Sequence, residues 1–132
     1  MLIAIDDEPA ERQVRAILES AGNRVVTAAD GAAALRILSA HPCDLVLCDA
    51  MLPDMDGFEV CRAIKQAPAT RHIPVLILLG SDDEVERGRA FQAAADDVVI
   101  KPVEQTLLLT LCATSCGSPA WTIRSTTSKA WS

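Results

Sequence analysis

The chain has 132 residues, of which 50% are hydrophobic, 23% are charged and 3% are aromatic. That length suits one domain of ordinary size, and the apolar content excludes an intrinsically disordered chain. The net charge of −6 disfavours nucleic acid as a direct partner, because its phosphates are also negative. No apolar run approaches the roughly 18 residues of a membrane span. The acidic start of the chain is unlike a secretory signal, so we expect a cytoplasmic protein with no membrane partner.

Short apolar runs alternate with amphipathic stretches from the N-terminus as far as Cys112. The runs are rich in Val, Ile and Leu and lack polar alternation, as is typical of strands buried on both faces of a parallel sheet. We predict five strands, at Leu2–Ile5, Val25–Ala28, Leu45–Cys48, Val75–Leu79 and Val98–Ile100. Five helices are predicted to alternate with them, at Pro9–Ala21, Gly31–Ala40, Phe58–Gln66, Asp83–Ala94 and Val103–Cys112. This order predicts an α/β fold, a doubly wound five-stranded parallel sheet flanked by five helices.

Capping residues support several of these helix limits. Pro9 lies in the first turn of the first helix, and Gly22 follows its last residue. Asp30 is a candidate N-cap for the second helix, which we expect to stop before Pro42. The third helix should likewise end before Pro68.

The five cysteines and two histidines do not form a recognisable metal or redox motif. None of the cysteines belongs to a CxxC pair, and their number is odd. Cys48 lies within an apolar run and is expected to be a small buried hydrophobe. His41 and His72 lie near prolines in predicted loops, where we expect neither metal binding nor catalysis.

Charged residues follow three of the predicted strands. Asp6 and Asp7 follow the first strand, Asp49 follows the third, and Lys101 follows the fifth. Any one such aspartate could be a turn former or a helix cap. In a parallel sheet, however, these positions share one edge, and three close carboxylates need a cation. Few, short oxygen ligands suit Mg²⁺, and a carboxylate beside a lysine can accept a phosphoryl group, so the pattern predicts Mg²⁺-dependent phosphoryl transfer to an aspartate.

The acidic run from Asp54 to Gly57 invites two other interpretations, a calcium loop and a dehalogenase-type phosphatase. If Gly57 took the sixth position of an EF-hand, positions one and twelve would be Leu52 and Ala63, which are not ligands. The phosphatase interpretation needs an apolar strand before the acidic pair, and Pro53 stands there instead. We set both interpretations aside.

Six motifs lie in register with the predicted strand–helix units, namely Ile5–Glu8, Leu45–Asp49, Met51–Phe58, Ile73–Val75, Ala95–Asp97 and Lys101-Pro102. Together they resemble a response-regulator receiver domain of the CheY-like kind, from about residue 1 to residue 112. The resemblance implies that Asp49 is the phosphoacceptor and that Lys101 contacts the phosphoryl group. It also implies a Mg²⁺ site formed by Asp6, Asp7, Asp49 and the backbone carbonyl of Met51. In this site Asp6 would act through a water.

The resemblance further implies features of the loops beside these residues. Pro53 and Gly57 would shape the loop after the phosphoacceptor strand, and we expect Gly57 to adopt a backbone conformation that other residues disfavour. The peptide bond between Lys101 and Pro102 would be cis.

Two positions depart from the family pattern. Leu79 stands where the family has a Thr or Ser that hydrogen-bonds the phosphoryl oxygen, and leucine cannot donate that bond. Val98 stands where the family usually has Tyr or Phe, and the short β-branched side chain is too stiff and small to serve as a rotameric switch. We consider Ser81, two residues after Leu79, as a substitute hydroxyl. The sequence therefore predicts intact phosphorylation chemistry without the usual switch pair.

The resemblance implies a phosphoacceptor in a two-component phosphorelay rather than an enzyme, with at most slow self-dephosphorylation. Its phosphoryl donor would be a histidine kinase or a phosphotransfer protein; the downstream effector is unknown, and a homodimer is compatible with the family. The alternative interpretation is a receiver-like interaction module that works independently of phosphorylation. Mg²⁺ binding separates the two, because only the first requires it.

The stretch from residue 113 to residue 132 differs from the rest of the chain. Nine of its residues are Ser or Thr, and Trp121 and Trp131 follow no helical or strand period. We therefore predict a receiver domain over residues 1–112 and a Ser/Thr-rich tail over residues 113–132, with no output domain.

Overall fold

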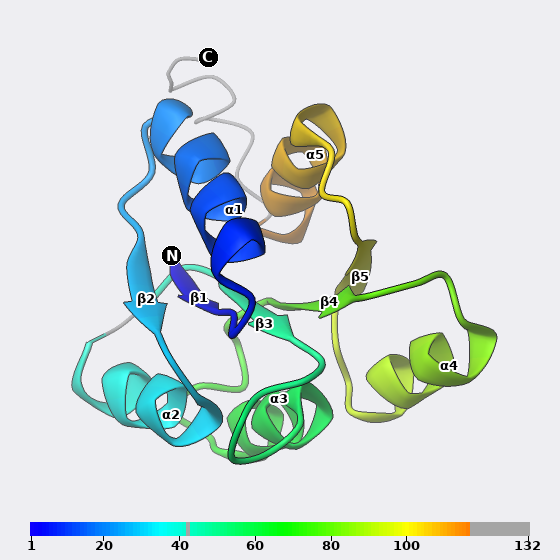
Figure 1. Ribbon diagram of the computed structural model, residues 1–132. Helices are drawn as coiled ribbons and strands as arrows, with labels where there is room; N and C mark the ends of the chain where they lie inside the picture. The colour runs from blue at the N-terminus through cyan, green and yellow to red at the C-terminus, as the bar shows by residue number, and fades with distance from the viewer. Residues whose placement is uncertain (42, 117–132) are drawn as a thin grey trace.

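The computed structural model describes residues 1–41 and 43–116 (Figure 1). It contains one parallel sheet in the order β2-β1-β3-β4-β5. The strands are β1 (Leu2–Ala4), β2 (Val26–Ala28), β3 (Val46–Asp49), β4 (Val75–Leu79) and β5 (Asp97–Ile100). The helices are α1 (Glu8–Ser20), α2 (Gly31–Ala40), α3 (Gly57–Gln66), α4 (Glu84–Gln92) and α5 (Gln105–Cys116). The predicted doubly wound α/β fold is confirmed.

The helices form two layers, with α1 and α5 on one face of the sheet and α2, α3 and α4 on the other (Figure 1). Alternate strand residues point to opposite faces, so neighbours in sequence belong to different apolar clusters. Ile77 and Leu79 pack in the cluster with Phe58 of α3, whereas Leu78 packs with Leu108 of α5. Both clusters consist of side chains that are almost fully buried. Apolar side chains therefore cover both faces of the sheet, and polar functional groups are expected at the ends of the strands.

Strand β2 is less buried than its sequence suggested. We expected all five runs to be covered on both faces, yet Val26 and Thr27 are exposed and Val26 retains 44% of its accessible surface. The strand lies at an edge of the sheet and packs mainly against one helix, α2, whereas β5 at the other edge packs against both α4 and α5. Apolar composition alone does not distinguish an edge strand from a central one.

Helix α5 begins and ends later than predicted. Its start moves to Gln105 because the Glu104 carboxylate caps the helix, accepting hydrogen bonds from the Leu107 N–H at 2.8 Å and the Thr106 N–H at 3.1 Å. These bonds hold the pKa of Glu104 below its ordinary value. The helix runs to Cys116, past the predicted end at residue 112, because adding a residue to an existing helix needs no apolar period. The rest of the predicted tail, residues 117–132, lies outside the described residues.

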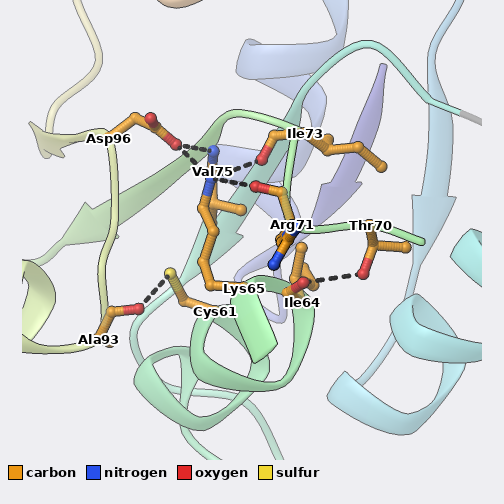
Figure 2. Close-up of polar contacts among 9 residues, drawn as sticks. All are labelled: Cys61, Ile64, Lys65, Thr70, Arg71, Ile73, Val75, Ala93 and Asp96. Carbon is orange, nitrogen blue, oxygen red and sulfur yellow. Dashed lines mark hydrogen bonds and ion pairs between the residues drawn. The ribbon is translucent and has the colours of Figure 1, made fainter. Parts of the chain in front are cut away.

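The edge of the sheet where β4 begins is held by a lysine–aspartate pair (Figure 2). Lys65, near the end of α3, donates to the carbonyl of Ile73 at 2.8 Å and lies 2.9 Å from the Asp96 carboxylate. Asp96 also accepts a hydrogen bond from the Val75 N–H at 2.7 Å. Only 15% of the Lys65 side chain is exposed. Helix α3, the start of β4 and the approach to β5 are thereby joined at this edge.

Three of the cysteines are buried in the core, as expected for Cys48. Cys48, Cys61 and Cys112 are each fully buried, and Cys61 donates to the carbonyl of Ala93 at 3.3 Å. Burial raises the pKa of the Cys61 thiol to about 11 and raises that of Cys48 further. Both of these thiols therefore remain protonated at neutral pH, and a protonated thiol is a poor nucleophile. Within the described part of the chain, no helix has the length and apolar character needed to cross a membrane.

Candidate functional site

The carboxyl ends of β1, β3 and β5 bring three charged side chains together. Asp49, the last residue of β3, is 4% exposed and is the only buried charged residue in the described part of the chain. Its Oδ2 lies 3.1 Å from Nζ of Lys101, which lies 3.7 Å from Oδ2 of Asp7. The Asp49 Oδ1 accepts a longer hydrogen bond, 3.3 Å, from the Met51 N–H. One ammonium thus faces two of the three carboxylates that the sequence predicted for this edge.

Asp7 is at a helix N-cap position, but its side chain does not cap the helix. In α2, α3 and α4 the N-cap aspartate accepts a hydrogen bond from a backbone N–H of the first turn, at 2.7–2.8 Å. At the start of α1 only the backbone carbonyl of Asp7 bonds to Glu11, and the side chain makes no capping bond. The simple explanation of this aspartate as a helix cap therefore fails, and its carboxylate is directed toward Lys101 instead.

Asp6 forms no ion pair with Lys101, whose ion pairs are with Asp7 and Asp49. Its side chain is exposed and lines a hollow of about 350 Å³ between the start of α1 and the end of β2. Asp7 and Lys101 line a separate hollow of about 390 Å³, together with Gly80 and the segment after β5. The structure therefore joins Asp7, Asp49 and Lys101 through ion pairs, whereas the exposed Asp6 side chain is not part of these pairs.

The donor atoms at this edge suit Mg²⁺. Among residues 1–41 and 43–116, no three His, Cys, Asp or Glu side chains are grouped so that they could hold a metal ion, so the predicted cluster of three carboxylates is not formed. Two carboxylates, those of Asp7 and Asp49, nevertheless lie 3.7 Å and 3.1 Å from one ammonium. Mg²⁺ prefers oxygen ligands and keeps several waters, so it needs only one or two carboxylates from a protein. The residues present fit that demand.

The loop from Ala50 to Asp56 closes beside Asp49. Met51 and Asp56 form an isolated antiparallel bridge, and the Gly57 N–H donates to the carbonyl of Ala50 at 2.8 Å. A Cβ atom on Gly57 would overlap the carbonyl oxygen of Asp49. Gly57 is not among the described glycines with positive φ, so our expectation of an unusual conformation is wrong. The requirement for glycine comes from the close approach of α3 to the backbone of Asp49.

The two departures from the family pattern are apolar core residues. Leu79 ends β4 and is fully buried, and Val98 in β5 is 8% exposed. Both belong to the cluster under α2, α3 and α4. Ser81, the substitute hydroxyl that we considered, lies on the exposed loop before α4. Neither buried side chain offers a hydrogen-bonding group to the site.

The segment after β5 is tied to α1. The peptide bond between Lys101 and Pro102 is cis, as the family resemblance implied. Just beyond it, the carbonyl of Val103 accepts a hydrogen bond from the Gln13 side chain at 2.8 Å. The same helix that follows Asp7 therefore also fixes the chain that follows Lys101.

Asp54 has a structural role that the sequence did not reveal, because it caps a helix other than its own. We examined it only as a calcium or phosphatase residue, yet its carboxylate accepts hydrogen bonds from the first two N–H groups of α2, those of Gly31 and Ala32. These bonds hold the pKa of Asp54 below its ordinary value. Because both partners belong to an earlier strand–helix unit, far from Asp54 along the chain, spacing alone gave no signal for the contact.

A sequence profile of the response regulator receiver domain matches residues 2–113. The chain belongs to this family. It is 37% identical over 108 residues to the response regulator PleD from Caulobacter vibrioides, covering 82% of the chain and 24% of PleD. The chain thus spans about a quarter of the length of that relative.

Two solved receiver domains have the same fold. One, from a signal transduction histidine kinase of Syntrophus aciditrophicus, has a TM-score of 0.81 and 31% identity, with 88% of each chain covered. The other, from the sensor histidine kinase PA1611 of Pseudomonas aeruginosa, has a TM-score of 0.82 and 29% identity, over 89% of this chain and 96% of that one. The PA1611 receiver holds a magnesium ion in its active-site cleft. This chain is accordingly a phosphoacceptor receiver domain of two-component signalling.

Proposed function

We propose that Asp49 is the residue of this receiver domain that accepts the phosphoryl group. The buried Asp49 carboxylate, 3.1 Å from the Lys101 ammonium, is the observation that supports this most directly. A carboxylate fixed in orientation can attack phosphorus, and an ammonium beside it can neutralise phosphoryl oxygens without reorganising. Asp7 supplies a second carboxylate to the same ammonium.

The reaction on this site is a transfer between two side chains. An oxygen of Asp49 forms a bond to phosphorus, and the bond from phosphorus to the imidazole nitrogen of a donor phosphohistidine breaks. The electron pair of that bond stays on the imidazole, which then takes up a proton. Lys101, which pairs with the Asp49 carboxylate before the transfer, then pairs with the phosphoryl oxygens.

We assign the cofactor Mg²⁺ to the same residues. Asp7, Asp49 and the Met51 carbonyl would hold it, with Asp6 acting through a water. When bound, Mg²⁺ supplies positive charge to the phosphoryl oxygens. A histidine kinase or phosphotransfer protein is the proposed donor, slow self-dephosphorylation is the only catalysis we attribute to the domain, and the cytoplasmic location expected from the sequence remains part of this proposal.

The second candidate function is an interaction module that does not depend on phosphorylation. Leu79 and Val98 favour it, because both are buried apolar side chains where the family resemblance implied a hydroxyl and an aromatic switch. A conformational response needs two arrangements that a ligand distinguishes, and these side chains supply no polar group to sense a phosphoryl oxygen.

The test is intact-mass analysis of the chain after incubation with acetyl phosphate and Mg²⁺, with Asp49→Asn as the matched variant. Asparagine keeps the size of the side chain but is a poor nucleophile. We expect one phosphoryl adduct on the native chain, none on the variant, and none without Mg²⁺. If beryllofluoride with Mg²⁺ does not bind and no adduct forms, the phosphoacceptor assignment fails and the interaction module replaces it.

A further inference from the structure

The loop that follows Asp49 is attached to a second helix through Asp54. The Oδ1 atom of Asp54 accepts hydrogen bonds from the N–H groups of Gly31 at 2.8 Å and Met55 at 2.9 Å. Its Oδ2 accepts a third from Ala32 at 2.9 Å. Gly31 and Ala32 are the first residues of α2, whose N–H groups have no partner within the helix. Asp54 thus caps a helix that belongs to a different strand–helix unit.

This cap differs from the one that α2 already has. Asp30, the N-cap residue of α2, accepts from the Ala33 N–H at 2.7 Å. Asp30 and Asp54 therefore share the same helix end and divide its free N–H groups between them. Of these two capping aspartates, only Asp54 belongs to the loop beside Asp49, so only Asp54 joins the N–H groups of that helix end to the loop by hydrogen bonds.

The attachment is tight. A Cβ atom on Gly31 would lie 2.5 Å from Cγ of Met55, so the Met55 side chain packs directly against the start of α2. The lowered pKa of Asp54 agrees with a carboxylate that is ionised and facing backbone N–H groups. Charge, hydrogen bonds and packing all hold the outer part of this loop in one place.

The inner part of the same loop contacts the phosphoacceptor. The Met51 N–H donates to Oδ1 of Asp49 at 3.3 Å, and Met51 is bridged to Asp56 across the loop. The Met51 side chain is 74% exposed, so burial does not hold this residue in place. The position of its backbone therefore depends on how the rest of the loop is anchored.

We propose that Asp54 is a positioning residue for phosphoryl transfer, which fixes the loop on α2 and thereby holds the Met51 backbone against Asp49. The inference rests on the proposed function, in which the Met51 carbonyl belongs to the Mg²⁺ site. Residues that orient a metal ligand without touching the metal typically change metal affinity about 10- to 100-fold when they are removed.

The experiment compares Asp54→Ala with Asp30→Ala in the full chain. Both variants lose one cap of α2, but only the first releases the loop. Mg²⁺ affinity is measured by isothermal titration calorimetry, and adduct formation with acetyl phosphate is followed by intact mass at several Mg²⁺ concentrations. We expect Mg²⁺ affinity to fall roughly 10-fold in Asp54→Ala, with a rate loss that high Mg²⁺ partly restores, and no comparable change in Asp30→Ala.

A third variant, Asp54→Asn, keeps one acceptor oxygen and should recover part of the affinity; it also serves if Asp54→Ala does not fold. Equal Mg²⁺ affinity in folded Asp54 and Asp30 variants overturns the positioning role while leaving the proposed function intact. If the native chain itself neither binds Mg²⁺ nor forms an adduct, the proposed function fails and the role of Asp54 fails with it.

Discussion

The guanidinium carbon of Arg89 lies 4.4 Å from the centre of the Phe58 ring. The same guanidinium reaches Oδ2 of Asp56 at 3.4 Å, and Asp56 caps α3. Arg89 is in α4, so one side chain joins this helix to the first turn of α3 and to the end of the loop beside Asp49. Arg89 thus forms a polar contact between α4 and the loop beside Asp49.

Replacing Arg89 with Met should lower the free energy of unfolding by about 0.5–1.5 kcal/mol, because a cation–π contact with Phe58 and the partly exposed ion pairs with Asp56 and Glu86 are all lost. Urea unfolding measures the change. Arg87→Met is the control, since Arg87 is on the same helix and pairs only with the exposed Asp82 among its described contacts. Equal losses in the two variants would show that the Phe58 contact contributes nothing of its own.

Lys65→Met should destabilise the domain by roughly 2–3 kcal/mol, because it leaves Asp96 and the carbonyl of Ile73 without their cationic partner in a largely buried position. Partial exposure of Asp96 sets the estimate below the value for a fully buried pair. Chemical denaturation measures the loss. Arg62→Met, an exposed change on the same helix, should alter stability by less than about 0.5 kcal/mol; a similar loss in both variants would contradict the prediction.

Ala94 has a φ of 69°, in the left-handed region that disfavours side chains. Ala94→Gly removes this cost but adds chain entropy to the unfolded state, so we expect a net gain of about 0.5–1 kcal/mol. Thermal unfolding checks the sign. Gly22, with a φ of 90°, provides the reverse experiment, and Gly22→Ala should lose about 1 kcal/mol. A destabilised Ala94→Gly chain would show that the Ala94 methyl makes a contact that outweighs the strain.

The pH dependence of stability should reflect Asp54. Its pKa in the folded chain lies below the ordinary value of 3.8, so folding favours the ionised form. The stabilisation is complete above that ordinary value and is lost as the pH falls through the lower, folded-state pKa. Urea midpoints of the native chain and Asp54→Ala should therefore differ by a constant amount near neutral pH and converge below about pH 4. A difference that persists unchanged in acid would mean that the carboxylate charge is not what matters.

The strand–helix order and the convergence of Asp7, Asp49 and Lys101 follow from sequence, because parallel strands place their carboxyl ends at one edge. The limits of the apolar runs differ slightly from those of the strands at several ends, since run and strand are defined by different properties. Sequence does not show whether a strand lies at an edge, so the exposure of Val26 was missed.

Contacts between distant segments could not be predicted in the same way. Asp54 bonds to the start of α2, and Lys65 bonds to Asp96, and in each case whole secondary-structure elements separate the partners along the chain. Aspartates that cap their own helix are recognisable from the turn that follows them, as Asp30 was. An aspartate that caps another helix leaves no local pattern.

Glycine is required at position 57 by a close contact with a neighbouring backbone and not by an unusual backbone angle. Its Cβ is excluded by the carbonyl oxygen of Asp49, whereas Ala94 is disfavoured only by its own backbone angle. Asparagine tolerates left-handed backbone and could replace Ala94, but it would be as excluded at position 57 as any other residue with a Cβ. In a library of variants, position 94 can therefore take residues that tolerate a left-handed backbone. Position 57 should remain glycine, because any Cβ atom would overlap the Asp49 carbonyl oxygen.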